Sequence, residues 1–161
     1  VVQHMPVGFT ASLAERLDNL SQLHVKEAAE GEELKKGWVY IAMGGKHLNV
    51  VTSPAGRHTL HLSEEPYREG VRPCANYMYE SLQNSRFDTV VCAVMRGMGA
   101  DGTEGISKLK SSGKTYVIAQ DQDTSVVFGM PKSIIQAGLA DQVVPLDQIA
   151  QEIILHVGVS K

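Results

Sequence analysis

The sequence predicts a single α/β domain over residues 1–161, built as a doubly wound, mainly parallel sheet with helices on both faces. Two observations predict this class. In the second half of the chain, short apolar runs alternate with helical patterns, which is typical of a parallel sheet covered on both sides. The chain has 161 residues, of which 43% are hydrophobic and 20% charged, as in ordinary globular domains. A β-hairpin excursion is expected near residues 36–62.

The first elements are expected to be the end of a strand and an amphipathic helix. Residues 1–4 resemble a strand tail that stops before Pro6 and Gly8. Thr10 is a good candidate for the N-cap of the helix that follows. The apolar residues expected on one face of this helix are Phe9, Leu13, Leu17 and Leu20.

Short strands are expected next, because the periodicity of the sequence changes after residue 25. Gly44-Gly45 and Pro54-Ala55-Gly56 separate the strand-like runs, which predicts β-hairpins. The predicted strands cover residues 39–42, 47–51 and 58–62, and a helical pattern covers 72–82. In the second half, strands are expected at 89–95, 115–120 and 141–145, and helices at 103–112, 131–137 and 146–157.

Composition excludes several classes of function. The 15 Lys and Arg residues against 18 Asp and Glu give a net charge of −3, so phosphate-driven binding to nucleic acid is not expected. No apolar run is long enough to insert across a bilayer. Cys74 and Cys92 form no disulfide framework, although one bridge between them remains open. A reducing, cytoplasmic location is expected, since no signal peptide is recognisable.

The most informative segment is the glycine-rich turn at residues 96–103, which follows a buried strand and opens a helix. Such turns hold the ligands of open α/β sheets. Gly97, Gly99 and Gly102 match G-x-G-x-x-G, and Asp121 lies 19 residues beyond Gly102. Dinucleotide binding is therefore one alternative. It is the less favoured one, because Asp101 would set a negative charge where a pyrophosphate should bind.

Asp101 is better suited to orienting a histidine. A carboxylate at the carboxyl end of a strand can accept a hydrogen bond from an imidazole and fix its tautomer. His4 also follows a strand-like run, so the two residues are candidates for a catalytic pair at the same sheet edge. The structural alternatives stay open, since an Asp before Gly is often a turn or helix cap and a single His is often structural.

A catalytic His–Asp pair requires a nucleophile, and the sequence offers none in a suitable place. No G-x-S-x-G elbow exists. Ser12 falls on a predicted helix and Ser53 in a hairpin turn; Ser125, beside the strand-like run 126–128, is the best placed, yet a structural role fits it better. The chain begins without Met and partway through a strand. We therefore expect a missing upstream segment to carry the nucleophile.

Seven segments spread over nearly the whole chain carry a resemblance to a known family. They are Gln3-His4-Met5-Pro6, Gly8-Phe9-Thr10, Ala14-Glu15-Arg16-Leu17, Gly44-Gly45-Lys46-His47-Leu48, Arg72-Pro73, Gly97-Met98-Gly99-Ala100-Asp101-Gly102 and Val126-Val127-Phe128-Gly129-Met130-Pro131. With these motifs, in this order, the chain resembles the catalytic domains of bacterial chemotaxis protein-glutamate methylesterases (CheB type).

The resemblance implies a serine hydrolase that demethylates glutamyl methyl esters on chemoreceptor signalling helices and deamidates certain glutamines. It implies His4 as general base, Asp101 as its orienting partner and the Met98 backbone N–H as an oxyanion donor. The nucleophilic serine would lie upstream, in a Ser-Thr-Gly-Gly turn that is absent from this chain. A phosphorylatable receiver domain, acted on by its histidine kinase, is expected further upstream. A non-catalytic receptor-binding module remains the alternative for the chain as given.

The sequence departs from the family pattern at two places. Cys74, Ala75 and Asn76 follow the Arg-Pro pair where the family often has Ser and Asp. Met95-Arg96 precedes Gly-Met-Gly where Leu-Thr is common, so a positive charge lies beside the proposed site and substrate preference is expected to differ. No metal or organic cofactor is expected: His58 and His61 would point to opposite faces of a strand. His47 is expected to shape its loop.

Overall fold

The computed structural model describes residues 1–157 of the chain. The contacts divide it into two compact units, Val1–Arg86 and Phe87–Lys161. Each unit combines helices with parallel strands, in agreement with the predicted α/β class. Within residues 1–157, no helix is both long enough and apolar enough to cross a bilayer.

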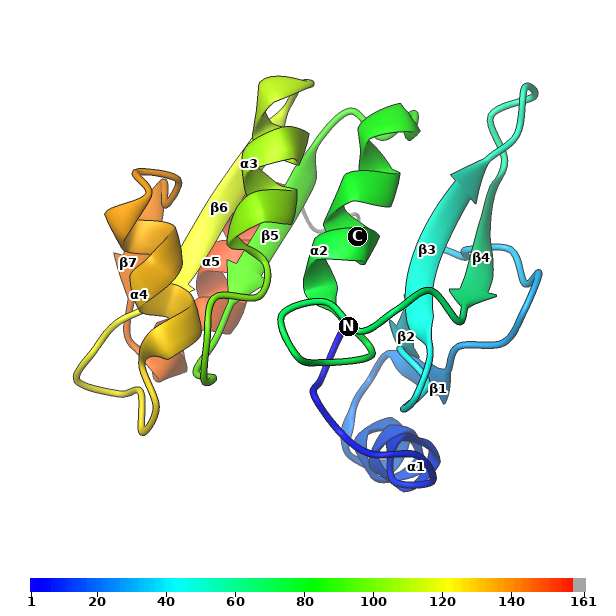
Figure 1. The fold of residues 1–161 in the computed structure, drawn as a ribbon, viewed down its shortest axis with the longest axis horizontal. Helices are drawn as coiled ribbons and strands as arrows, with labels where there is room; N and C mark the ends of the chain where they lie inside the picture. The colour runs from blue at the N-terminus through cyan, green and yellow to red at the C-terminus, as the bar shows by residue number, and fades with distance from the viewer. Residues whose placement is uncertain (158–161) are drawn as a thin grey trace. The chain divides into compact units, whose positions relative to one another are not determined.

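The first unit begins with helix α1 (Thr10–Leu20) and a parallel pair of strands, β1 (His24–Glu27) and β2 (Trp38–Ile41) (Figure 1). Successive side chains of β2 point to opposite faces of the strand, so the two faces pack against different elements. Ile41 packs with Ala14 of α1, whereas Tyr40 faces the next pair of strands.

The second pair of strands in this unit is the hairpin of β3 (His47–Thr52) and β4 (His58–Ser63), which are antiparallel. Helix α2 (Ala75–Ser81) and the short 3-10 helix η1 (Leu82–Asn84) pack along β3. This hairpin confirms the predicted excursion, but helix α2 begins only after Cys74, later than the helical pattern suggested.

One predicted hairpin is wrong: β2 does not pair with β3. On one edge β2 pairs with β1, a strand that the sequence analysis missed. On the other edge it bonds Val1, whose nitrogen donates to Tyr40 O at 2.7 Å and whose carbonyl accepts from Ala42 N at 2.8 Å. Both hydrogen-bonding edges of β2 are therefore in use. The rest of the expected strand at residues 2–4 has no regular structure.

Helix α1 also differs from expectation. Thr10 is its first residue and does not cap it, because the N-cap is Phe9 and makes no side-chain cap hydrogen bond. The predicted apolar face of this helix is largely exposed, with Phe9 59% and Leu20 74% accessible. The helix packs instead through its small residues Thr10 and Ala14. Small side chains let the helix backbone approach the strands closely, which leaves the larger ones at the margin.

The second unit is a three-stranded parallel sheet in the order β5 (Val90–Val94), β6 (Thr115–Gln120), β7 (Gln142–Val144). Helices α3 (Thr103–Ser111) and α4 (Gly129–Gln136) lie on one face of the sheet in Figure 1, and α5 (Ile149–Val157), preceded by the 3-10 helix η2 (Leu146–Gln148), lies on the other. All of the predicted strands and helices of this half are confirmed. The run at 126–128, which is strand-like in sequence, is an irregular loop.

The sheet of the second unit is buried on both faces. Ile118 packs with Val144 and Ile149 on the side of α5, while Val117 points to the opposite face and is also fully buried. Continuous burial explains why these strands read as apolar runs. Cys92 of β5 is a buried thiol, and so is Cys74 in the first unit. Burial raises the pKa of the Cys92 thiol to about 12.

An ion pair near the sheet should make stability depend on pH. Partial burial alone would raise the pKa of Asp141, but hydrogen bonds from Lys110 (2.6 Å) and Val117 N (2.8 Å) outweigh it and lower the pKa below the ordinary 3.8. Because the pKa of Asp141 is lower in the folded state than in the unfolded state, its ionised carboxylate stabilises the fold when the pH is above the ordinary pKa. This contribution is lost as the pH falls through the folded-state pKa.

We expect Asp141→Asn to lower the unfolding temperature at neutral pH and to make the unfolding temperature depend less on pH in the acid range. Thermal unfolding from about pH 3 to 6 tests this; an unchanged slope would contradict it, and Asp147→Asn, on exposed η2, is the control.

Candidate active site

The glycine-rich turn after β5 is held by main-chain atoms. Gly97 N donates to Val127 O at 2.9 Å, and Gly97 O accepts from Met130 N at 2.8 Å. A Cβ at Gly129 would lie 2.9 Å from Gly99 N and 3.0 Å from Gly97 O. The start of α4 therefore packs directly against the turn, at a distance that only glycine allows.

The same turn contains both predicted site residues of the second unit. Gly99 and Gly102 have φ angles of +87° and +99°, the left-handed region that favours glycine. Between them, Asp101 is a carboxylate with only 1% of its surface exposed, whereas the Met98 side chain is 81% exposed. Within residues 1–157, the Met98 N–H donates to no acceptor. The turn thus presents an uncommitted N–H three residues before a buried carboxylate.

A buried glutamine that the sequence analysis missed anchors the start of this turn. Gln120, the last residue of β6, is fully buried. Its Oε1 accepts from Arg96 N at 2.9 Å, and its Nε2 donates to Thr124 O at 2.9 Å. The sequence did contain a clue to Gln120, namely a polar side chain at the end of a buried strand. A buried side-chain amide needs hydrogen-bond partners. Gln120 joins the loops that follow β5 and β6.

The adjacent Asp121 has a local role. Its Oδ1 accepts from Thr124 N at 3.0 Å and from the Thr124 hydroxyl at 2.6 Å. In a dinucleotide site this carboxylate would bind a ribose, but here it closes the turn after β6. Gly97 is in addition covered by the side chain of Met130. Both observations disfavour the dinucleotide alternative.

In the first unit, His4 is half-buried on the segment that leads into α1. The turn between β2 and β3 packs against this segment. A Cβ at Gly44 would lie 2.5 Å from Pro6 O and 3.0 Å from Met5 O. The backbone immediately after His4 therefore has a fixed support from the Gly44-Gly45 turn.

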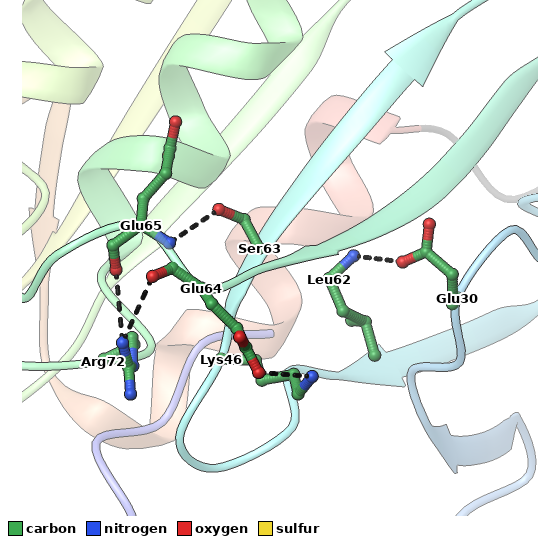
Figure 2. A network of polar contacts seen from close by, with 7 residues as sticks. All are labelled: Glu30, Lys46, Leu62, Ser63, Glu64, Glu65 and Arg72. Carbon is green, nitrogen blue, oxygen red and sulfur yellow. Dashed lines mark hydrogen bonds and ion pairs between the residues drawn. The ribbon is translucent and has the colours of Figure 1, made fainter.

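The Gly44-Gly45 turn is itself held against the segment that follows β4, as Figure 2 shows in part. Lys46 Nζ contacts Glu64 Oε1 at 3.1 Å, and Arg72 Nη1 donates to Glu64 O at 3.4 Å. The Lys46 hydrogen bond lowers the pKa of Glu64. Gly45 N also donates to Arg72 O at 3.2 Å.

His47 completes this support in the way that was expected of a structural histidine. Its ring is fully buried. Cys74 N donates to Nδ1 at 3.1 Å, and Nε2 donates to Pro66 O at 2.9 Å, which assigns the neutral Nε2–H tautomer. The ring also contacts Tyr77, with centroids 4.5 Å apart. Both nitrogens are occupied, so His47 shapes the loop.

The serines considered as nucleophiles are turn or surface residues. Ser125 Oγ donates to Asp121 O at 2.7 Å, and Ser53 Oγ accepts from Arg57 N at 3.1 Å. Ser12 lies exposed on α1. His58 and His61 have separate partners, Arg86 N at 3.0 Å and Glu30 Oε1 at 2.9 Å respectively. These contacts agree with the prediction that the two rings face opposite sides of β4.

The two predicted halves of the catalytic pair thus lie in different units: His4 in the first, Met98 and Asp101 in the second. Each half is in a segment whose backbone is held in place. The pairing of His4 with Asp101 stays a prediction.

Comparison with known proteins shows the family to which this chain belongs. The family model described as CheB methylesterase matches residues 1–153. This chain belongs to the CheB methylesterase family. The fold agrees: the crystal structure of the Thermotoga maritima CheB methylesterase catalytic domain is similar with a TM-score of 0.90 and 45% identity, over 96% of this chain and 81% of that one.

Curated members of the CheB methylesterase family are also similar in sequence. A protein-glutamate methylesterase/protein-glutamine glutaminase of Geobacillus kaustophilus is 49% identical over 157 residues, covering 98% of this chain and 45% of the relative. The protein of the same name in Pyrococcus horikoshii is 44% identical over 154 residues, covering 96% of this chain and 41% of the relative. The chain therefore spans less than half the length of these relatives.

Proposed function

We propose that the protein containing this chain is a cytoplasmic protein-glutamate methylesterase of chemotaxis adaptation. It hydrolyses glutamyl methyl esters on chemoreceptor signalling helices and deamidates glutamines there. The observation that carries this proposal is the family match over residues 1–153, together with curated relatives named for both activities. The chemistry needs only acid–base and nucleophilic groups, so no metal or organic cofactor is required.

The proposed mechanism is acyl transfer through a serine in a segment that precedes Val1. His4 takes the serine proton as the hydroxyl oxygen attacks the ester carbonyl carbon, and the protonated imidazole then donates that proton to the departing methoxide. Methanol leaves, and an acyl-enzyme remains. Water, deprotonated by His4, attacks the acyl-enzyme and releases glutamate and the serine. With a glutamine substrate the same steps release ammonia.

Asp101 and Met98 have supporting roles in this mechanism. The Asp101 carboxylate fixes the tautomer of His4 and stabilises the imidazolium that forms. The Met98 N–H donates to the oxyanion of the tetrahedral intermediate. Two features support these roles: the carboxylate is 1% exposed, and the N–H donates to no acceptor within residues 1–157.

The proposal includes a regulatory partner. A receiver domain upstream, phosphorylated through its histidine kinase, would restrict access to the site until it is modified. The length of the relatives supports an additional segment, since this chain covers only 45% of the Geobacillus kaustophilus protein. The full-length protein is the polypeptide that includes the proposed preceding segment.

The deciding experiment is methanol release from methylated chemoreceptor by the full-length protein. Release well above the rate in buffer would support the proposal. Residues 1–161 alone are expected to be inactive, because they lack the nucleophilic serine. Receptor binding without methanol release by the full-length protein would overturn the esterase and favour a binding module.

Arg96 should tune the substrate preference of this enzyme. Its backbone is anchored by Gln120, and its side chain is exposed beside the turn. We expect Arg96→Thr to lower kcat/KM for methyl-ester peptides flanked by acidic residues by about threefold at low salt, and less at high salt, because an exposed charge is screened. Peptides with neutral flanks should be unaffected. Lys114→Thr, an exposed residue at the amino end of β6, is the control; equal losses on both peptides would contradict the prediction.

Gly129→Ala should impair turnover through the main chain. The added Cβ would meet Gly99 N at 2.9 Å and Gly97 O at 3.0 Å, so the turn carrying Met98 must shift. Loss of one oxyanion donor lowers kcat by about 10²-fold or more. We expect a loss of that size in methanol release by the full-length protein. The control is Gly113→Ala, where a Cβ meets no atom within 4 Å; equal activity of both variants would show that the turn tolerates the shift.

A further inference from the structure

A buried hydroxyl links three elements of the first unit. Thr10 is fully buried at the start of α1. Its Oγ1 donates to Glu27 Oε2 at the end of β1, at 2.5 Å, and accepts from Gly44 N in the β2–β3 turn, at 3.0 Å. The hydroxyl thus donates to one element and accepts from another. It makes neither of these two hydrogen bonds with the end of its own helix. A hydrogen bond to a carboxylate is among the stronger kinds in proteins.

The second link runs from Gly44 to the segment that carries His4. Gly44 lies so close to the carbonyl oxygens of Met5 and Pro6 that no side chain fits between them. At its other end this segment is bonded to β2 through Val1. His4 is therefore held between two fixed points, and one of them depends on the orientation of the Gly44 peptide.

We propose that Thr10 is a positioning residue for His4, an inference that rests on the proposed role of His4 as general base. The Thr10 hydroxyl, held by Glu27, fixes the Gly44 peptide, and that peptide fixes the backbone at Met5 and Pro6. The position of the imidazole follows from this backbone. Misplacing a catalytic group by about 1 Å can lower the rate about 10²-fold, so the hydroxyl acts on the chemical step without touching substrate.

The test replaces the hydroxyl with a methyl group of similar size. In the full-length protein, Thr10→Val is expected to lower kcat for methanol release by about 10²-fold with KM unchanged, since substrate contacts remain. Thr10→Ser keeps the hydroxyl and is expected to restore kcat to near the wild-type value. Thr52→Val is the matched control: the Thr52 hydroxyl is buried and has no partner within residues 1–157.

A second variant and a second readout separate this proposal from a loss of folding and from failure of the proposed function. Gly44→Ala keeps the hydroxyl but pushes on Pro6, so it should reproduce the kcat loss. In Thr10→Val, the Gly44 amide should exchange faster with solvent and the His4 ring resonances should shift, in both cases by NMR. Both NMR measurements can be made even if the wild-type protein releases no methanol. Absence of methanol release would overturn the proposed function but not the positioning role of Thr10. Normal kcat in Thr10→Val, or unchanged His4 resonances, would overturn the positioning role.

Discussion

Replacing His4 with alanine is expected to lower the turnover of the full-length protein by about 10⁶-fold, the effect seen when the histidine of a serine-hydrolase triad is removed. In the proposed mechanism the imidazole takes the proton from the attacking serine and returns it to methoxide, and without the ring neither transfer takes place. KM should change little, because the ring acts in the transition state. The measurement is methanol release under single-turnover conditions.

The control for this variant is His61→Ala, which removes an exposed imidazole paired with Glu30 in the same unit. It should retain wild-type turnover. Circular dichroism of both variants checks that the fold is intact. Substantial turnover in His4→Ala would mean that another group is the base, and the mechanism above would have to be abandoned.

Asp101→Asn is expected to lower turnover by about 10⁴-fold, as for the corresponding change in a serine protease, where the amide favours the wrong tautomer of the histidine. The turn itself should keep its shape, because Asn is close in size to Asp and because glycines, main-chain bonds and the Gln120 amide hold the turn. Asp147→Asn, on exposed η2, serves as the control and should be fully active.

The double variant His4→Ala/Asp101→Asn tests whether the two residues act as one unit. If the carboxylate acts only through the imidazole, the double variant should be no slower than His4→Ala, because residues that act together are strongly non-additive. Independent, multiplying losses would show that Asp101 has a role apart from His4. The result bears directly on a pairing that joins distant parts of the sequence.

The second half of the chain could be predicted closely from its sequence, and the first half less so. Strand β6 was predicted with its observed bounds, because buried parallel strands are apolar runs between polar turns. Strand β1 was missed since three of its residues, His24, Lys26 and Glu27, are polar. The predicted hairpin between β2 and β3 was wrong because the sequence pattern does not tell which strand pairs with each edge of β2. Both edges of β2 have other partners, β1 on one and Val1 on the other.

The candidate site divides in the same way. Motif and position in the chain were enough to select His4, Met98 and Asp101 as candidates. The residues that hold their segments were not predicted: Gln120 and Thr10 act through bonds to atoms distant in sequence. Whether a polar residue in an apolar setting has a partner is a property of packing. A single sequence indicates only that a partner is needed.

In the turn after β5, the atoms that hold the backbone differ from the side chains that are presented to solvent. Its geometry depends on glycines, main-chain bonds and one buried amide, whereas Met98 in the turn and Val126 in the loop after β6 are 81% and 82% exposed. Substitutions at these two surface positions therefore leave the backbone where it is. Under the proposed function, receptors with different surfaces would be accommodated by changing those side chains alone, so substrate range would evolve while the backbone geometry of the turn is inherited unchanged.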